Sequence, residues 1–132
     1  MSILEAVVLF AAADEEDPQH HKALGYLESL GHADFYVASF ALLEFDIVLK
    51  SRAYTFDERM EKHALLLRDF PLVEEKSSKL RPSTFYLAAK IEKEVGLEYF
   101  DAGVAAESLQ HDGTVISTDA AFEKVASLRR AW

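Results

Sequence analysis

Residues 100–119 read FDAGVAAESLQHDGTVISTD, and this stretch decides the fold. After Asp101, the small residues 102–106 (AGVAA) predict a helix in close contact with its neighbours. Gly113 marks a turn, and the β-branched run from Thr114 to Ser117 predicts a strand. A last short helix is expected after Asp119. The stretch therefore predicts a helix, a strand and a second helix in succession.

Outward from this stretch, the chain alternates expected strands with expected helices. Strands are predicted at Ser2 to Val8, at Phe35 to Val37 and, very short, at Leu72-Val73. Helix starts are predicted where a capping residue or a proline precedes an apolar stripe: after Asp17-Pro18, at Ser39, at Thr55 or Asp57, and at Pro82. In the helix from Pro82, Phe85 and Tyr86 are expected to point inward. Because strands separated by helices form parallel sheets covered on both faces, we expect an α/β fold, a three-layer α/β/α sandwich with a mostly parallel central sheet.

The composition fits one globular domain over residues 1–132 and restricts its chemistry. Half of the chain is hydrophobic and 28% is charged, and no apolar run reaches the roughly 18 residues of a membrane helix. We therefore expect no membrane contact. There is no cysteine, which excludes disulfides, zinc–thiolate sites and thiol nucleophiles and makes a reducing cytoplasm the simplest location.

The net charge is acidic, at −9 with 23 Asp and Glu against 14 Lys and Arg. A protein that binds nucleic acid through its overall charge is basic, so this chain needs another route to phosphate. That route is a local basic strip, a metal ion or a partner. The best local candidate is Lys76, Lys79 and Arg81, for which a solvated loop is the plainer interpretation.

Four acids occupy positions that a parallel sheet would bring to one edge. Glu5 lies at the end of the first strand, Glu44 lies within an apolar helix, Asp101 begins a helix, and Asp119 directly follows the last strand. Carboxylates gathered in this way repel one another, and a divalent cation removes the repulsion. Oxygen ligands alone indicate Mg²⁺ or Mn²⁺.

Three of these acids also have a purely structural interpretation. Asp101 and Asp119 are then helix N-caps, and Glu44 lies on a solvated helix face. Glu5 in a strand has no such explanation. Under this alternative, the chain is a helix-rich α/β domain whose acids are caps and surface groups.

Four segments, taken in order, resemble the PIN domain family, especially the small VapC-type toxins of prokaryotes. They are residues 3–5 (ILE), 42–44 (LLE), 100–106 (FDAGVAA) and 117–122 (STDAAF), of which the last two are the more specific. The resemblance covers nearly the whole chain. It implies a metal-dependent ribonuclease that hydrolyses RNA with Mg²⁺ or Mn²⁺, usually as a homodimer. Toxin members are held inactive by a small antitoxin.

The resemblance also implies residue roles. Glu5, Glu44, Asp101 and Asp119 would be the catalytic metal ligands, and Thr118 would hydrogen-bond the scissile phosphate or orient a ligand. A metal held there would lower the pKa of a water and stabilise the developing charge. An acidic cleft is also a natural receptor for an arginine or lysine of a partner chain, which would compete with the metal.

Three positions depart from the family pattern. Glu5 replaces the usual aspartate, which moves the carboxylate outward by about 1.5 Å. Val7 stands where a small hydroxyl or amide is usual, and Ala121 stands where a further acid often follows. These departures favour an alternative function, a non-catalytic PIN-like domain that acts as a binding or assembly protein.

Overall fold

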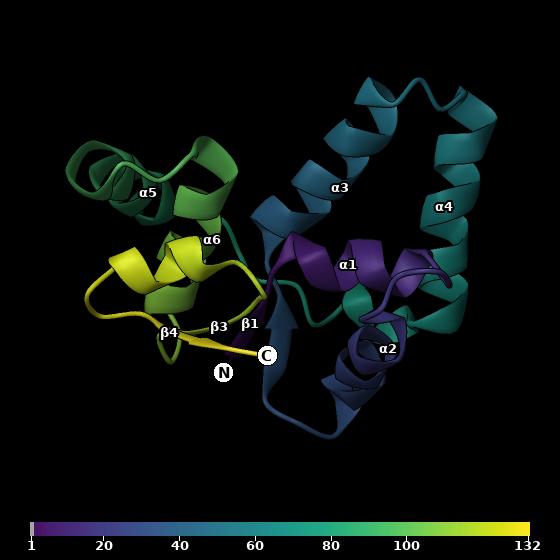
Figure 1. The fold of residues 1–132 in the computed structure, drawn as a ribbon, viewed down its shortest axis with the longest axis horizontal. Helices are drawn as coiled ribbons and strands as arrows, with labels where there is room; N and C mark the ends of the chain where they lie inside the picture. Colours follow the sequence, from purple (N-terminus) through teal and green to yellow (C-terminus); the bar gives the residue numbers. More distant parts are fainter. Residues whose placement is uncertain (1) are drawn as a thin grey trace.

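The computed structural model describes residues 2–132, and at its centre lies a four-stranded parallel sheet (Figure 1). The strand order is β2-β1-β3-β4. The strands are β1 (Ser2–Leu4), β2 (Phe35–Val37), β3 (Thr114–Ile116) and β4 (Arg129–Ala131). Every neighbouring pair is parallel, so the carboxyl ends of the strands lie along the same edge of the sheet.

Six α-helices of the described chain flank this sheet. They are α1 (Ala6–Ala13), α2 (His20–Glu28), α3 (Ser39–Ser51), α4 (Phe56–Asp69), α5 (Pro82–Val95) and α6 (Tyr99–Leu109). Three short 3₁₀ turns of the described chain lie in the connections between elements: η1 (Ser29–Gly31), η2 (Pro71–Val73) and η3 (Ala120–Lys124). In Figure 1, α5 and α6 lie on one side of the strands, α1 and α2 lie on the other, and α3 and α4 extend upward as a pair. The predicted α/β fold with a parallel sheet is confirmed.

The helix α6 is the most deeply buried of these elements. Residues 102–108 are all buried, and α6 contacts both β1 and β3 as well as α5. Its close approach to α3 depends on Gly103, because a Cβ atom at that position would lie 2.4 Å from the ring of Phe40. Phe40 is itself only 1% exposed, so its ring has no room to move aside. The absence of a side chain at Gly103 thus sets how closely α3 and α6 approach.

Gly103→Ala is expected to lower the free energy of unfolding by about 1–3 kcal/mol, the usual effect of forcing an extra carbon into a packed core. Urea unfolding of the purified protein measures this change. The matched control is Gly25→Ala in α2, where no atom outside the helix lies within 4 Å of an added Cβ. There we expect a gain of roughly 0.4–1 kcal/mol, because alanine restricts the unfolded chain. Equal stability of Gly103→Ala and the wild type would contradict a tight contact between α3 and α6.

The predicted strand from Ser2 to Val8 is wrong beyond its first half. The strand β1 ends at Leu4, and α1 begins at Ala6 with Glu5 as its N-cap. The sequence of α1, AVVLFAAA, is apolar on every side, and a short apolar run of this kind does not distinguish a buried strand from a buried helix.

Three smaller expectations also differ from the structure, and one strand was not expected. Leu72-Val73 belongs to the 3₁₀ turn η2, and β4 was not predicted. The second helix begins at His20 rather than at Pro18, because the Asp17 carboxylate accepts the Gln19 N–H (2.7 Å) and closes a turn first. Phe85 and Tyr86 point outward, with 45% and 74% of their surface exposed.

In residues 2–132, no helix is both long and apolar enough to cross a membrane.

Candidate metal centre

The four predicted acids come from four separate segments that meet at the carboxyl edge of the sheet. Glu5 follows β1, Glu44 lies in α3, Asp101 lies in the first turn of α6, and Asp119 precedes η3. Their charges act on one another: Glu44 and Asp101 repel Glu5, Asp101 repels Glu44, and Asp119 repels Asp101. The fold therefore brings the four predicted positions together.

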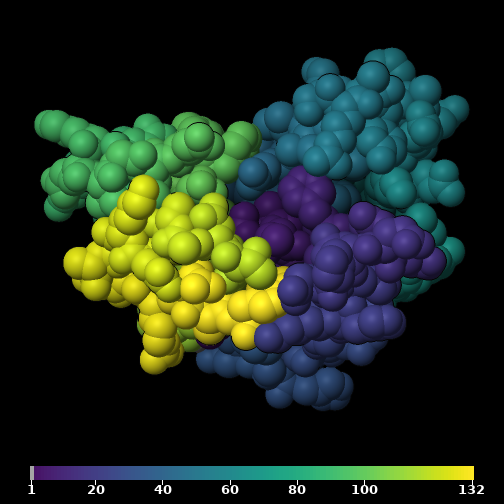
Figure 2. Space-filling view, in the orientation of Figure 1, coloured from purple at the N-terminus to yellow at the C-terminus, as the bar shows by residue number. Residues whose placement is uncertain are grey.

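Figure 2 shows the surface at which these segments meet. The purple N-terminal segment comes to the surface between the green α5–α6 region, the yellow C-terminal region and the blue helix α3, and the surface is hollowed there. Segments that are distant in sequence thus border one recess.

Glu5 is the most buried of the four acids, with 7% of its surface exposed. Its Oε2 atom accepts hydrogen bonds from the Val7 backbone N–H (3.1 Å) and from the Ser117 hydroxyl (3.0 Å). Burial raises the pKa of Glu5 to about 7, against the lowering effect of these two hydrogen bonds. Near neutral pH this carboxyl group is therefore divided between its protonated and ionised forms.

Glu44 and Asp101 are half-buried, and the negative charge of Asp101 acts on Glu44. Burial raises the pKa of both, and the charge of Glu98 adds to the increase in each case. The Oε2 atom of Glu44 is buried without a hydrogen-bond partner among the described residues. An unsatisfied buried carboxylate oxygen is costly, and a cation would remove that cost.

Asp119 and Thr118 lie at the exposed rim of the site. The Asp119 carboxylate accepts the Ala121 backbone N–H (2.9 Å), so this residue does cap η3 as the structural interpretation expects. It nevertheless raises the pKa of Asp101, which places its charge within the cluster. Capping and cluster membership are therefore compatible at this position.

Two polar residues of the site were not identified from the sequence. The Ser117 hydroxyl donates to Glu5 and accepts the Asp119 backbone N–H (3.0 Å), so it joins two of the predicted acids. Glu98 is the N-cap residue of α6 and raises the pKa of Glu44 and Asp101. The available signals were the position of Ser117 directly after β3 and the i, i+3 spacing of Glu98 and Asp101.

The donor set fits a hard divalent cation, since all four predicted ligands offer carboxylate oxygens. The buried Glu44 Oε2, which has no hydrogen-bond partner among the described residues, supports the same conclusion. As the side chains stand, no three acids or histidines of residues 2–132 are arranged closely enough to coordinate an ion. The structure thus shows a cluster of repelling carboxylates rather than a formed coordination sphere.

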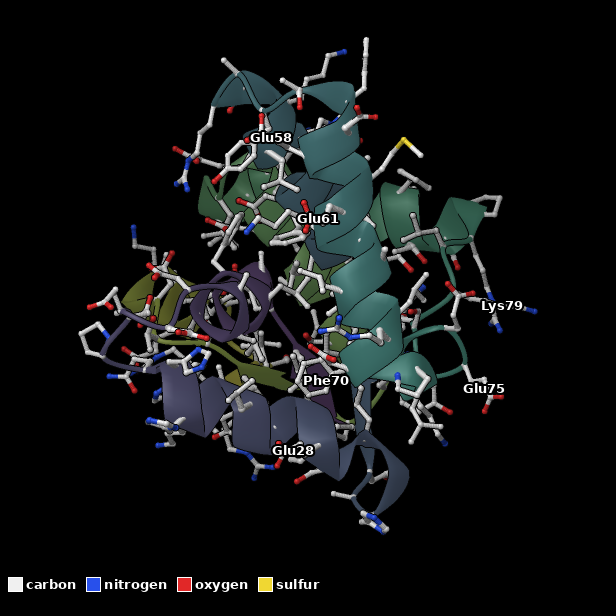
Figure 3. All side chains as sticks on the ribbon, turned by 90° about the vertical axis from the view of Figure 1, so that its right-hand side faces the viewer. Glu28, Glu58, Glu61, Phe70, Glu75 and Lys79 are labelled. Atoms are coloured by element: carbon white, nitrogen blue, oxygen red, sulfur yellow. The ribbon has the colours of Figure 1, made fainter. Side chains whose placement is uncertain are left out.

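A separate cavity of about 390 Å³ lies between α1, α2 and α4. Its apolar lining includes Leu9, Leu24, Phe45, Leu65 and Phe70. Figure 3 looks onto α4 and shows Phe70 at the lower end of this helix, beside α2. Charged residues, among them Glu15, Lys62, Arg68 and Asp69, also line the cavity.

Comparisons with known proteins give a family from the sequence and a fold from solved structures. The family model described as PIN domain matches residues 3–128. No curated protein matches the sequence. FitAcB from Neisseria gonorrhoeae is similar with a TM-score of 0.74 and 18% identity, over 98% of this chain and 96% of that chain. VapBC2 from Rickettsia felis, bound to a DNA fragment from its promoter, gives 0.72 and 11%, over 98% and 96%.

A third solved structure extends this likeness. PAE2754 from Pyrobaculum aerophilum has a TM-score of 0.60 and 17% identity, over 98% of this chain and 87% of that chain. The TM-scores of 0.60–0.74 show a shared fold. At 11–18% identity, the activity of this chain must be argued from its own site.

Proposed function

Because the chain belongs to the PIN domain family, which its sequence matches over residues 3–128, we propose that it is a divalent-metal-dependent endoribonuclease. The reaction is hydrolysis of RNA phosphodiester bonds. The observation that carries this proposal is the cluster of mutually repelling carboxylates, in which Glu44 Oε2 is buried with no hydrogen-bond partner in residues 2–132. Such an arrangement is costly in a protein that does not use it.

In this mechanism, Glu5, Glu44, Asp101 and Asp119 would hold Mg²⁺ or Mn²⁺. Such an ion would lower the pKa of a water and offset the charge that develops on the phosphate. Val7 N–H and the Ser117 hydroxyl fix Oε2 of Glu5, which leaves Oε1 available to the cation. Thr118, at the exposed rim, hydrogen-bonds the scissile phosphate.

The approach of RNA needs positive charge that the whole molecule lacks. We place it at Lys76, Lys79 and Arg81, in the connection between η2 and α5. Lys79 and Arg81 are exposed, and Figure 3 shows Lys79 extending into solvent. Lys76 lies against the Tyr36 ring, with its Nζ 5.3 Å from the ring centroid. Lys79 and Arg81 are therefore freer than Lys76 to contact phosphate.

A second candidate function, a non-catalytic binding or assembly domain, is favoured by the environment of Glu5 and Asp119. The residues that depart from the family pattern, Val7 and Ala121, contribute only backbone N–H groups to these two acids. No side-chain polar group is added at either position. Mn²⁺ titration and RNA cleavage on the same purified sample separate the two functions: binding with turnover supports the nuclease, and binding without turnover supports the alternative.

Two protein partners accompany the proposal. Exposed apolar side chains on α3 and α5, namely Leu43, Ile47, Phe85 and Tyr86, suit a homodimer contact. The apolar cavity between α1, α2 and α4 suits a segment of a small antitoxin. Both surfaces are apolar areas of the kind that mark interaction sites on soluble proteins.

A basic side chain from such a partner is expected to compete with the metal. An arginine-containing peptide should raise the Mn²⁺ concentration needed for half-maximal cleavage, because its guanidinium can pair with the same carboxylates. Cleavage assays at several Mn²⁺ concentrations measure the shift. A peptide of the same sequence with citrulline in place of arginine is the control. Equal inhibition by both peptides would rule out competition at the carboxylates.

A further inference from the structure

The first turn of α3 takes its hydrogen-bond acceptor from another helix. The residue before α3 is Ala38, whose side chain cannot accept a hydrogen bond, and the Ser39 hydroxyl, predicted as the cap, instead donates to the Ser78 carbonyl oxygen. The backbone N–H groups of Ser39 and Phe40 donate to Glu107 Oε1 (2.8 Å) and Oε2 (3.1 Å). Glu107 of α6 therefore caps α3, with one carboxylate oxygen on each exposed N–H.

Glu107 is fully buried, which makes this cap unusual. Its exposed fraction is 0%, and burial raises the pKa of Glu107 to about 7 despite the bonds from Ser39 and Phe40 and a further bond from Ser78. The Ser78 hydroxyl also lies 3.2 Å from His111 Nε2. A buried carboxylate costs free energy that an apolar residue would avoid. The role of Glu107 therefore lies in the groups that its hydrogen bonds hold in place.

Glu107 fixes the relative position of α3 and α6, the helices that carry Glu44 and Asp101. Gly103 and Glu107 are four residues apart, so they lie on the same face of α6. Gly103 receives the Phe40 ring, and Glu107 binds the N–H groups of Ser39 and Phe40. The glycine sets the closest approach of the helices, and the glutamate opposes their separation.

We infer that Glu107 is a positioning residue of the metal site, which fixes the spacing of Glu44 from Asp101 by fastening the start of α3 to α6. The inference rests on the proposed metal-dependent function. Glu107 touches neither ion nor RNA in this role. It acts through the backbone of α3, on which Glu44 lies one turn beyond the fastened residues.

Glu107→Gln tests this inference in the full chain. Glutamine keeps the volume and one acceptor oxygen, but its NH₂ group faces a backbone N–H and loses that bond. We expect Mn²⁺ affinity to fall about tenfold or more, the usual effect of removing a residue behind metal ligands. The Mn²⁺ concentration for half-maximal RNA cleavage rises equally. At saturating Mn²⁺ the cleavage rate returns close to that of the wild type, because all four ligands remain.

The matched control is Thr55→Ala, which removes the N-cap of α4. Thr55 accepts the Glu58 N–H (3.1 Å) in a capping box, and α4 carries none of the four acids. This variant is expected to lower Tm without changing Mn²⁺ affinity. Equal loss of affinity in Thr55→Ala and Glu107→Gln would show a general structural defect and overturn the inference.

The remaining outcomes separate the inference from the proposed function. A wild-type protein that binds no Mn²⁺ overturns the metal-dependent function, and the positioning role with it. Wild-type binding with unchanged affinity in Glu107→Gln overturns the positioning role alone. If Glu107→Gln does not fold, Ser78→Ala decides, because it removes one hydroxyl donor to Glu107. There we expect a smaller loss of affinity in the same direction, and unchanged affinity overturns the inference.

Discussion

Asp101→Asn is expected to lower Mn²⁺-dependent RNA cleavage by roughly 100-fold or more and to weaken Mn²⁺ binding with it. Residues behind the ligands already contribute roughly 10- to 100-fold to metal sites, and Asp101 is proposed as a ligand itself. Asparagine keeps the shape of the side chain and removes the charge that raises the pKa of Glu5 and Glu44. Isothermal titration with Mn²⁺ and a cleavage assay on the same sample measure both effects.

The matched control is Asp57→Asn, the same substitution in the first turn of α4. Asp57 is exposed and lies in a helix that carries none of the four acids, so cleavage and Mn²⁺ binding should be unchanged. Full cleavage by Asp101→Asn would refute the proposed mechanism. Retained Mn²⁺ binding with no cleavage in the wild type would instead identify a cation site without nuclease activity.

The free energy of unfolding of the metal-free protein is expected to fall as pH rises from about 4.5 to 7. Glu5 and Glu107 ionise near pH 4.5 when unfolded but have a pKa of about 7 in the folded protein. Between these values the folded state binds more protons than the unfolded state, so raising the pH favours unfolding. Each group contributes roughly 3 kcal/mol, and the raised pKa values of Glu44 and Asp101 act in the same direction. Urea unfolding at pH 5 and pH 7.5 measures the difference.

Glu5→Gln should remove the part of this pH dependence that Glu5 contributes, which is less than half of the total, and should unfold at a higher urea concentration than the wild type at pH 7.5. The exposed Glu94 of α5 provides the control, since Glu94→Gln should leave the pH dependence unchanged. At pH 7.5, Mn²⁺ should restore stability to the wild type more than to Glu5→Gln. Stability that stays level or rises between pH 5 and 7.5 would show that these carboxyl groups are solvated.

Much of the architecture follows from local signals in the sequence. Thr55 forms the capping box that starts α4, Pro82 begins α5, and Gly96 ends α5 with a φ of 83°. These positions could be predicted because each depends on a few neighbouring residues. The meeting of the four acids could also be predicted, because strand ends in a parallel sheet share one edge.

The rest depends on contacts between distant parts of the chain. Nothing local marks Glu107 as the cap of Ser39, 68 residues away, or Ser117 as the partner of Glu5, 112 residues away. The strand β4 pairs with β3, and its residues Arg129 and Arg130 are not typical of strands. The outward position of Tyr86 likewise depends on which face of α5 meets α6.

The pairing of β1 with β3 has a consequence for when activity can arise during synthesis. Ile3 pairs with Val115, so the central two strands come from opposite ends of the described chain. A nascent chain that has released only its first hundred residues lacks Ser117 and Asp119 and cannot complete the sheet edge that gathers the acids. Contacts so distant in sequence form late in folding. The proposed metal site would therefore be complete only after residue 119 has left the ribosome.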